Sequence, residues 1–116
     1  MRGFLRAYVR AVLERRGDLS ITAVLLLALV IGSGVAMHLL ERRAQPEAFG
    51  TLAACLYWAS MTVTTVGYGD LAPATGAGRL VAVLTAFIGA GFLVVTAGIL
   101  AAGFVEEMEK HPARRR

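Results

Sequence analysis

The residues best suited to specific chemistry lie in residues 64–70, which read TTVGYGD. This run holds no catalytic set, and its only charged residue comes last. It offers oxygen instead, from the consecutive backbone carbonyls of Thr65 to Tyr68 and the Thr65 hydroxyl. Gly67 and Gly69 permit positive φ values, which would turn successive carbonyls to one side. A row of neutral oxygens is suited to a hard cation.

Elsewhere the sequence shows no catalytic constellation. The isolated nucleophiles are Ser20, Ser33, Ser60 and Cys55. None has an acid–base partner in the pattern, because His38 and His111 are expected on opposite sides of a membrane. Cys55 is the only cysteine, so neither an intrachain disulfide nor a cysteine metal cluster is available. We therefore expect no enzyme and no bound organic cofactor.

The composition indicates a membrane protein of one small domain. Hydrophobic residues make up 57% and charged residues 17% of the 116 positions, against about 45–50% and 25% in soluble proteins. The net charge of +4 arises from basic residues at the two ends. Those residues are Arg2, Arg6, Arg10, Arg15 and Arg16 before the first apolar run, and Lys110, Arg114, Arg115 and Arg116 after the last. Because they do not alternate with aromatic residues, no nucleic-acid partner is expected.

Two apolar segments are long enough to cross a membrane. Residues 19–40 and 80–105 carry about 22 and about 26 uncharged positions, against the roughly 20 that a crossing needs. A signal peptide is the alternative for the first segment. That alternative is less favoured, because the apolar run exceeds a typical signal-peptide core and bulky residues follow Gly34.

A third uncharged segment, residues 48–69, is expected to enter and leave the membrane on its outer face. Two crossings place both basic ends in the cytoplasm, as the positive-inside tendency favours, whereas three would separate them. A helix from Thr51 must stop near Thr64, and a dozen residues span only about 18 Å. The non-helical backbone that follows is tolerated at that depth only if protein buries it or it lines a watery path.

Thr65-Val66-Gly67-Tyr68-Gly69 resembles the selectivity-filter signature of the potassium-channel family. In that family the signature forms a cation filter made of backbone carbonyls. The chain is similar to the pore module of two-span, KcsA-like bacterial channels over residues 19–109. The resemblance implies an all-α membrane protein with a re-entrant pore helix, an extended filter and a homotetrameric assembly.

The resemblance also implies roles for individual residues. K⁺ would be the permeant ion, held by the carbonyls of Thr65, Val66, Gly67 and Tyr68 and by the Thr65 hydroxyl. The filter would be supported by Tyr57, Trp58, Met61, Gly69 and Asp70. Trp58 is expected to brace Tyr68, and Tyr57 to approach Asp70. Met61 departs from the pattern, since KcsA-like channels carry a glutamate there.

A gate and hinge are expected on the inner helix, at Gly89, Leu93, Ala97, Ala101, Phe104 and Val105. Leu93, Ala97, Ala101 and Val105 recur every fourth residue and so share a face. That face would line a pore or pack against the outer span. The resemblance favours the lining role, in which an apolar constriction closes by dewetting.

Together these expectations define the domain organisation of the chain. Residues 1–18 form a cytoplasmic interfacial helix facing anionic lipids, and residues 19–109 form the pore domain. Within the pore domain the expected parts are an outer helix at 19–40, a turret at 41–50, a pore helix at 51–63, a filter at 64–70 and an inner helix at 78–106. Residues 110–116 form a basic cytoplasmic tail that includes His111. We expect a multi-pass protein of the cell membrane with both termini in the cytoplasm.

Several alternatives stay open. The turret is closer to voltage-sensor-like or cyclic-nucleotide-regulated bacterial channels, so a natural minimal channel and a pore from a larger channel are both compatible with the sequence. A weakly selective cation channel is the main functional alternative, because a GYG core does not guarantee selection of K⁺ over Na⁺. A small membrane scaffold would account for two spans and basic ends, but not for residues 64–70.

Overall fold

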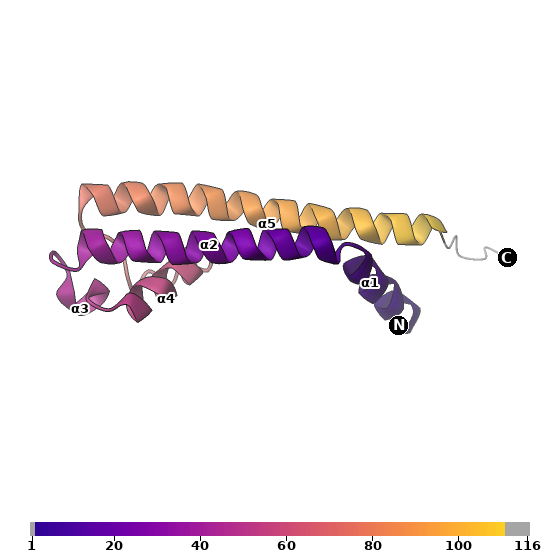
Figure 1. Ribbon diagram of the computed structural model, residues 1–116, viewed down its shortest axis with the longest axis horizontal. Helices are drawn as coiled ribbons and strands as arrows, with labels where there is room; N and C mark the ends of the chain where they lie inside the picture. The colour runs from indigo at the N-terminus through magenta and orange to yellow at the C-terminus, as the bar shows by residue number, and fades with distance from the viewer. Residues whose placement is uncertain (1, 111–116) are drawn as a thin grey trace. The chain divides into compact units, whose positions relative to one another are not determined.

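The computed structural model describes residues 2–110, and its regular elements there are helices (Figure 1). They are α1 (Arg2–Glu14), α2 (Arg16–Glu41), α3 (Pro46–Phe49), α4 (Leu52–Val63) and α5 (Gly76–Lys110). The chain divides into two compact units. The central unit is Val24–Leu93, and the terminal unit comprises the described residues up to Ala23 and from Val94 onward. His111 and the rest of the expected tail beyond Lys110 lie outside the described residues.

The two long helices have the length and apolar character of membrane spans. α2 has 26 residues and α5 has 35. Only 17% of the apolar window of α2 and 11% of that of α5 are buried, which distinguishes them from the core helix of a soluble protein. At 1.5 Å per residue α5 is about 52 Å long, so it exceeds a hydrocarbon layer of roughly 30 Å. α4 has 12 residues and is too short to cross.

Local sequence signals set the start of α3 and of α4. Pro46 occupies the first turn of α3, where its missing N–H costs nothing. Gly50 follows α3, and a side chain is excluded there because a Cβ would lie 2.0 Å from the Pro46 carbonyl oxygen. Thr51 then caps α4, with its hydroxyl accepting a hydrogen bond from the Ala54 N–H at 3.2 Å. The chain can therefore turn from α3 into α4 within a few residues.

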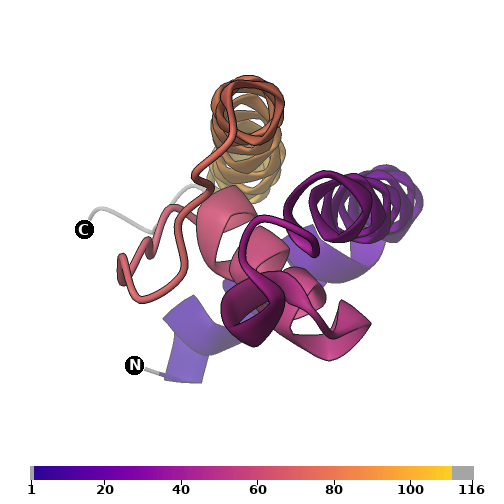
Figure 2. The ribbon, with the colours of Figure 1, turned by 90° about the vertical axis from the view of Figure 1, so that its left-hand side faces the viewer.

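α4 lies beside α2 and α3 (Figure 2), and the core of the central unit is formed where these three helices meet. Its buried members are Met37 from α2, Phe49 from α3, and Cys55, Trp58 and Ala59 from α4. The rings of Phe49 and Trp58 meet edge to face, with their centroids 6.3 Å apart. His38 Nδ1 also donates to the Phe49 carbonyl at 3.0 Å. The short helix α3 thus holds the N-terminal part of α4 against α2.

In the terminal unit α1 packs against the end of α5. The rings of Phe4 and Phe104 meet edge to face at 5.3 Å, and Ala11 is buried beside Gly103. Two ion pairs join the same two helices, Arg10–Glu107 and Glu14–Lys110, and a third joins Arg15, directly after α1, to Glu106. Exposed ion pairs contribute about 0–1 kcal/mol each, but Glu107 is only 4% exposed. These contacts give a reason for α5 to continue to Lys110, four residues past the expected end at 106.

Glu41, the last residue of α2, organises the outer loops of the central unit. Its carboxylate is fully buried and accepts hydrogen bonds from the N–H of Ala74 at 3.0 Å and of Thr75 at 2.9 Å. The Thr75 hydroxyl and the Gln45 amide also donate to it, the latter at 2.9 Å. A Cβ on Gly78 would lie 2.1 Å from Oε1 of Glu41. The carboxylate therefore ties the end of α2 to the start of α5.

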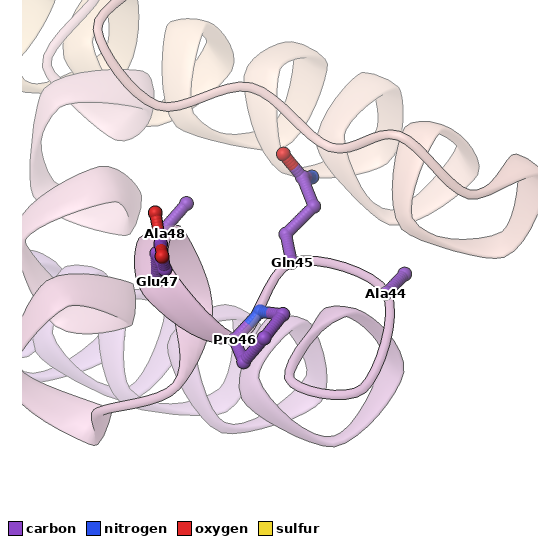
Figure 3. Close-up of a pocket in the computed structure, with 5 residues that line it drawn as sticks. All are labelled: Ala44, Gln45, Pro46, Glu47 and Ala48. Atoms are coloured by element: carbon purple, nitrogen blue, oxygen red, sulfur yellow. The ribbon is translucent and has the colours of Figure 1, made fainter.

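The expected turret contributes to the same network. Gln45 donates from Nε2 both to Glu41 and to the carbonyl of Ala72 at 3.0 Å. Figure 3 shows the Gln45 side chain extending away from Pro46, in an open pocket that Ala44, Glu47 and Ala48 also line. Gln45 thus connects the turret to the coil that follows residues 64–70.

We predict that Glu41→Gln lowers the free energy of unfolding by roughly 3 kcal/mol, because an amide places donors against buried N–H groups that need an acceptor. Trp58, the only tryptophan, lies in the core and reports unfolding by its fluorescence. Glu47→Gln makes the same chemical change at an exposed position of the turret and is the control. Equal stability of the two variants in thermal unfolding would contradict this role of Glu41.

Candidate functional site

Residues 64–70 adopt a backbone in which positive φ values alternate. Among the described residues, positive φ occurs at Thr65 (63°), Gly67 (53°) and Gly69 (75°), while Val66 and Tyr68 between them have negative values. The expectation of positive φ at Gly67 and Gly69 is confirmed. Alternation of left- and right-handed residues brings successive N–H groups to one side of a backbone. The carbonyls are then free to face the other side.

Hydrogen bonds to the end of α4 show which side the N–H groups take. The N–H of Thr64 donates to the Ser60 carbonyl at 3.1 Å, and that of Thr65 to the Thr62 carbonyl at 3.1 Å. The N–H of Gly67 reaches the Met61 carbonyl at 3.0 Å. Donors of this run are therefore paired with the last turn of α4. Met61 supports the run through its backbone, independently of its side chain.

The outer end of the run is held by a side-chain contact. The Tyr57 hydroxyl donates to Oδ2 of Asp70 at 2.9 Å, as the sequence predicts. This hydrogen bond to Asp70 is the largest cause of the raised pKa of Tyr57. The phenol therefore stays protonated and remains a donor at neutral pH. A charge-assisted bond of this kind is worth about 1.5–3 kcal/mol.

The other expected aromatic contact is not made within one chain. Trp58 is buried against Phe49, whereas the Tyr68 side chain is 72% exposed. All residues from 64 to 70 are exposed in the single chain, Tyr68 above all. The contact of Trp58 with Tyr68 stays a prediction for an assembly of several chains.

The expected gate residues differ in their surroundings. Ala97, Ala101 and Val105 are exposed, and Leu93 is half-buried. Phe104 packs against Phe4 of α1 in the terminal unit. Within one chain its ring therefore contacts α1, which differs from the expected role of lining a pore. Gly89 lies against the backbone of Val63 at the end of α4.

The side chains of residues 2–110 include no group of three or more His, Cys, Asp or Glu that could hold a metal ion. The carbonyls of Thr65 to Tyr68 remain the candidate oxygen ligands in this part of the chain. Neutral dipoles of this kind suit a monovalent cation that must enter and leave quickly, because tight binding would prevent conduction.

Two features of the site are not evident in the sequence pattern. Thr65 takes a positive φ, which is a strained state for a β-branched residue and typical of functional sites. In the sequence only the position of Thr65, two residues before Gly67, could have indicated this positive φ. Glu41 falls at the start of the expected turret, and no local pattern identifies it as buried.

Comparison with known proteins gives the context of this site. The model of a family described as "Ion channel" matches residues 24–106, which include α4, residues 64–70 and most of both long helices. The chain belongs to this ion-channel family. The family consists of membrane proteins that are not enzymes.

Similar proteins carry potassium-channel names. This ion channel is 40% identical over 97 residues to a cyclic nucleotide-gated potassium channel of Rhizobium etli, a match covering 84% of the chain and 27% of the relative. It is 41% identical over 76 residues to a second such channel, of Mesorhizobium japonicum, covering 66% of the chain and 21% of the relative. It is 38% identical over 85 residues to a human potassium voltage-gated channel, subfamily KQT member 4, covering 69% of the chain and 12% of the relative. The ion channel thus spans about a quarter or less of the length of these relatives.

We predict that Tyr57→Phe loosens residues 64–70, because it removes the one side-chain hydrogen bond seen at Asp70 in the described chain. Hydrogen–deuterium exchange of a peptide covering this run should become faster, by a factor of about ten for a loss near 1.4 kcal/mol. Tyr8→Phe, at an exposed position of α1, is the control and should leave that peptide unchanged. Unchanged exchange in Tyr57→Phe would show that Asp70 is anchored by other groups.

Proposed function

We propose that this ion channel conducts K⁺ selectively and passively through the central pore of a homotetramer. The observation that carries the proposal is the alternation of positive φ at Thr65, Gly67 and Gly69. Together with the N–H groups paired to α4, it leaves the carbonyls of residues 65–68 available to a cation. Relatives at about 40% identity are named potassium channels, which supports K⁺ as the permeant ion.

Selection follows from replacing the hydration shell of the ion. A dehydrated K⁺ needs several oxygens at once, and neutral carbonyls with the Thr65 hydroxyl supply them without a formal charge. One chain contributes one such strand. Several copies must therefore converge on a common axis before the ion is surrounded.

Exposure in the single chain supports assembly. Backbone that is neither helical nor covered is not stable in hydrocarbon, yet residues 64–70 are exposed throughout. Tyr68 at 72% and Val66 at 49% are large apolar side chains that neighbouring subunits would cover. Trp58 of one subunit would then lie behind Tyr68 of the next. The fourfold number itself comes from the family resemblance.

The proposed topology is that of a multi-pass protein in the cell membrane. α2 and α5 cross, α4 enters halfway from the outer face, and both termini lie in the cytoplasm. The 12-residue length of α4 supports its re-entrant position. The basic residues at the two ends of the sequence support cytoplasmic termini.

Anionic lipids of the inner leaflet are proposed partners of α1. Its exposed apolar side chains are Phe4, Leu5, Tyr8, Val9 and Leu13. Arg2 and Arg6 lie one turn apart and flank this face, whereas Arg10 pairs with Glu107. An interfacial helix of this kind buries its apolar face at the headgroups and turns its arginines to lipid phosphates.

The proposed gate is an apolar constriction on the inner helix. Ala97, Ala101 and Val105 are exposed in one chain and would line the pore below Leu93. Phe104 is assigned instead to the contact with α1. Closure at small apolar residues would exclude water rather than present a charge.

Purified protein in liposomes should pass K⁺ much faster than Na⁺. Gly67→Ala should abolish the K⁺ flux, because a Cβ strains the backbone at φ 53° although no atom of the same chain lies within 4 Å of it. Gly76→Ala is the control, since that glycine also has open space but no positive φ. Equal K⁺ and Na⁺ flux in the unmutated protein would instead identify a weakly selective cation channel. A monomer or dimer in mild detergent would contradict the tetramer.

The lipid partner has a separate test. We expect K⁺ flux to depend on phosphatidylserine when liposomes of phosphatidylcholine alone are compared with mixed ones. Replacing both Arg2 and Arg6 by Gln should remove most of that dependence, since each arginine near an anionic surface contributes about 1 kcal/mol. Arg42→Gln with Arg43→Gln removes the same charge from the turret and should leave the dependence intact. An undiminished dependence in the α1 variant would assign the lipid effect to another part of the chain.

A further inference from the structure

Gly89 of α5 makes a close contact with the backbone of α4. A Cβ on Gly89 would lie 2.9 Å from Cα of Val63 and 3.0 Å from its carbonyl oxygen. Both are backbone atoms, so no side-chain rotation can relieve the overlap. Val63 is 2% exposed and has little room to retreat. The absence of a side chain at position 89 therefore sets how closely α5 approaches the end of α4.

Val63 is the last residue of α4, and the ion-binding run starts directly after it. The N–H groups of Thr64 and Thr65 are bonded to the carbonyls of Ser60 and Thr62, in the same turn as Val63. A shift of this turn would therefore move the inner end of residues 64–70 with it. Val63, which Gly89 contacts, also lies only two residues before Thr65, whose backbone is strained.

A second glycine limits the other end of the same helix. A Cβ on Gly34 of α2 would lie 3.3 Å from both the Cys55 carbonyl oxygen and Cα of Leu56, and 2.9 Å from a Leu56 methyl group. Backbone of α4 thus touches backbone positions on both spanning helices. If a side chain at Gly89 pushed α4 away from α5, α4 could not move freely toward α2, because its contact with Gly34 is already close.

We propose that Gly89 is a positioning residue for ion selectivity, which acts by seating the end of α4 so that residues 64–67 keep the spacing a dehydrated K⁺ requires. The proposal rests on the proposed K⁺ conduction and adds a determinant outside the ion-binding run. It differs from the expected hinge role of Gly89, in which the glycine would absorb a change of φ and ψ when α5 bends. The space at this position is filled by Val63.

The chain provides a matched control two residues away. Gly91 lies in the same helix, and a Cβ added there would meet no atom within 4 Å, so Gly91→Ala changes helix propensity and bending freedom without a clash. The test compares the K⁺/Na⁺ permeability ratio, read from reversal potentials in planar bilayers, for unmutated protein, Gly89→Ala and Gly91→Ala. A general loss of stability lowers the number of channels and does not move this ratio.

We expect Gly89→Ala to lower the permeability ratio by about tenfold, a change equivalent to roughly 1.4 kcal/mol and within the usual cost of overpacking. Gly91→Ala should leave the ratio unchanged. An unchanged ratio in both variants overturns the proposal, as does an equal fall in both. A change in open time for Gly89→Ala at constant ratio would restore the hinge role and also overturn it.

Two further arrangements keep the outcome decisive. If Gly89→Ala alone does not assemble, it is co-expressed with a tagged unmutated subunit, and mixed channels purified on the tag are measured in the same way. An unmutated ratio in those mixed channels would overturn the proposal. The unmutated protein is measured first, because its failure to select K⁺ would contradict the proposed function, whereas failure in the variants alone contradicts only the role of Gly89.

Discussion

The hydrogen bond from the Gly67 N–H to the Met61 carbonyl, at 3.0 Å, gives a partner to a polar backbone group outside a helix, which is the main constraint on this molecule. Non-helical backbone within a membrane needs partners for its polar groups, since lipid offers none. Here N–H groups of the run after α4 return to carbonyls that a helix C-terminus leaves unpaired. One set of unsatisfied groups thus satisfies another. The carbonyls of the run are not used in these bonds, which is the basis for proposing them as cation ligands.

The rest of the central unit keeps that arrangement in place. Glu41 joins α2 to the coil before α5, and Tyr57 joins α4 to Asp70 at the outer end of the run. Gly34 and Gly89 allow α4 to lie close to both long helices. In lipid such close packing replaces the hydrophobic effect as a source of stability, because side chains gain little by leaving an apolar solvent.

The terminal unit uses a different set of interactions. An aromatic pair and two ion pairs join α1 to the end of α5, and a third ion pair joins Arg15, directly after α1, to Glu106. Most of these pairs are exposed and individually weak. Glu107 differs from the others because it is buried, and a buried carboxylate that pairs with Arg10 would lose more if that pair were broken. The C-terminal end of α5 is therefore coupled to a helix whose apolar side chains Leu5, Val9 and Leu13 remain exposed.

The sequence by itself determined which segments are long and apolar enough to cross a membrane, and it located the candidate site. Uncharged length identifies α2 and α5 as candidate spans. Gly67 and Gly69 indicate that α4 has ended and permit positive φ, and the approach of Tyr57 to Asp70 follows from the family resemblance. These features depend on short-range geometry and on the solvent, so they can be read from a linear pattern. The last residues of α5 were missed because their contacts with α1 are about ninety residues away in sequence.

Only the tertiary structure decided the burial of Glu41, the close approach of Gly89 to Val63, and the strained backbone of Thr65. A glutamate at the end of an apolar span is ordinarily exposed. Nothing next to Glu41 in the sequence indicates that the N–H groups of Ala74 and Thr75 will donate hydrogen bonds to its buried carboxylate. A glycine in a helix is equally compatible with a hinge, a packing contact or neither. Gly89 and Gly91 are indistinguishable in sequence, and they differ only because the end of α4 lies against one of them. Such contacts join residues that are far apart in the chain, and their physical cause is the packing of whole helices rather than any local preference.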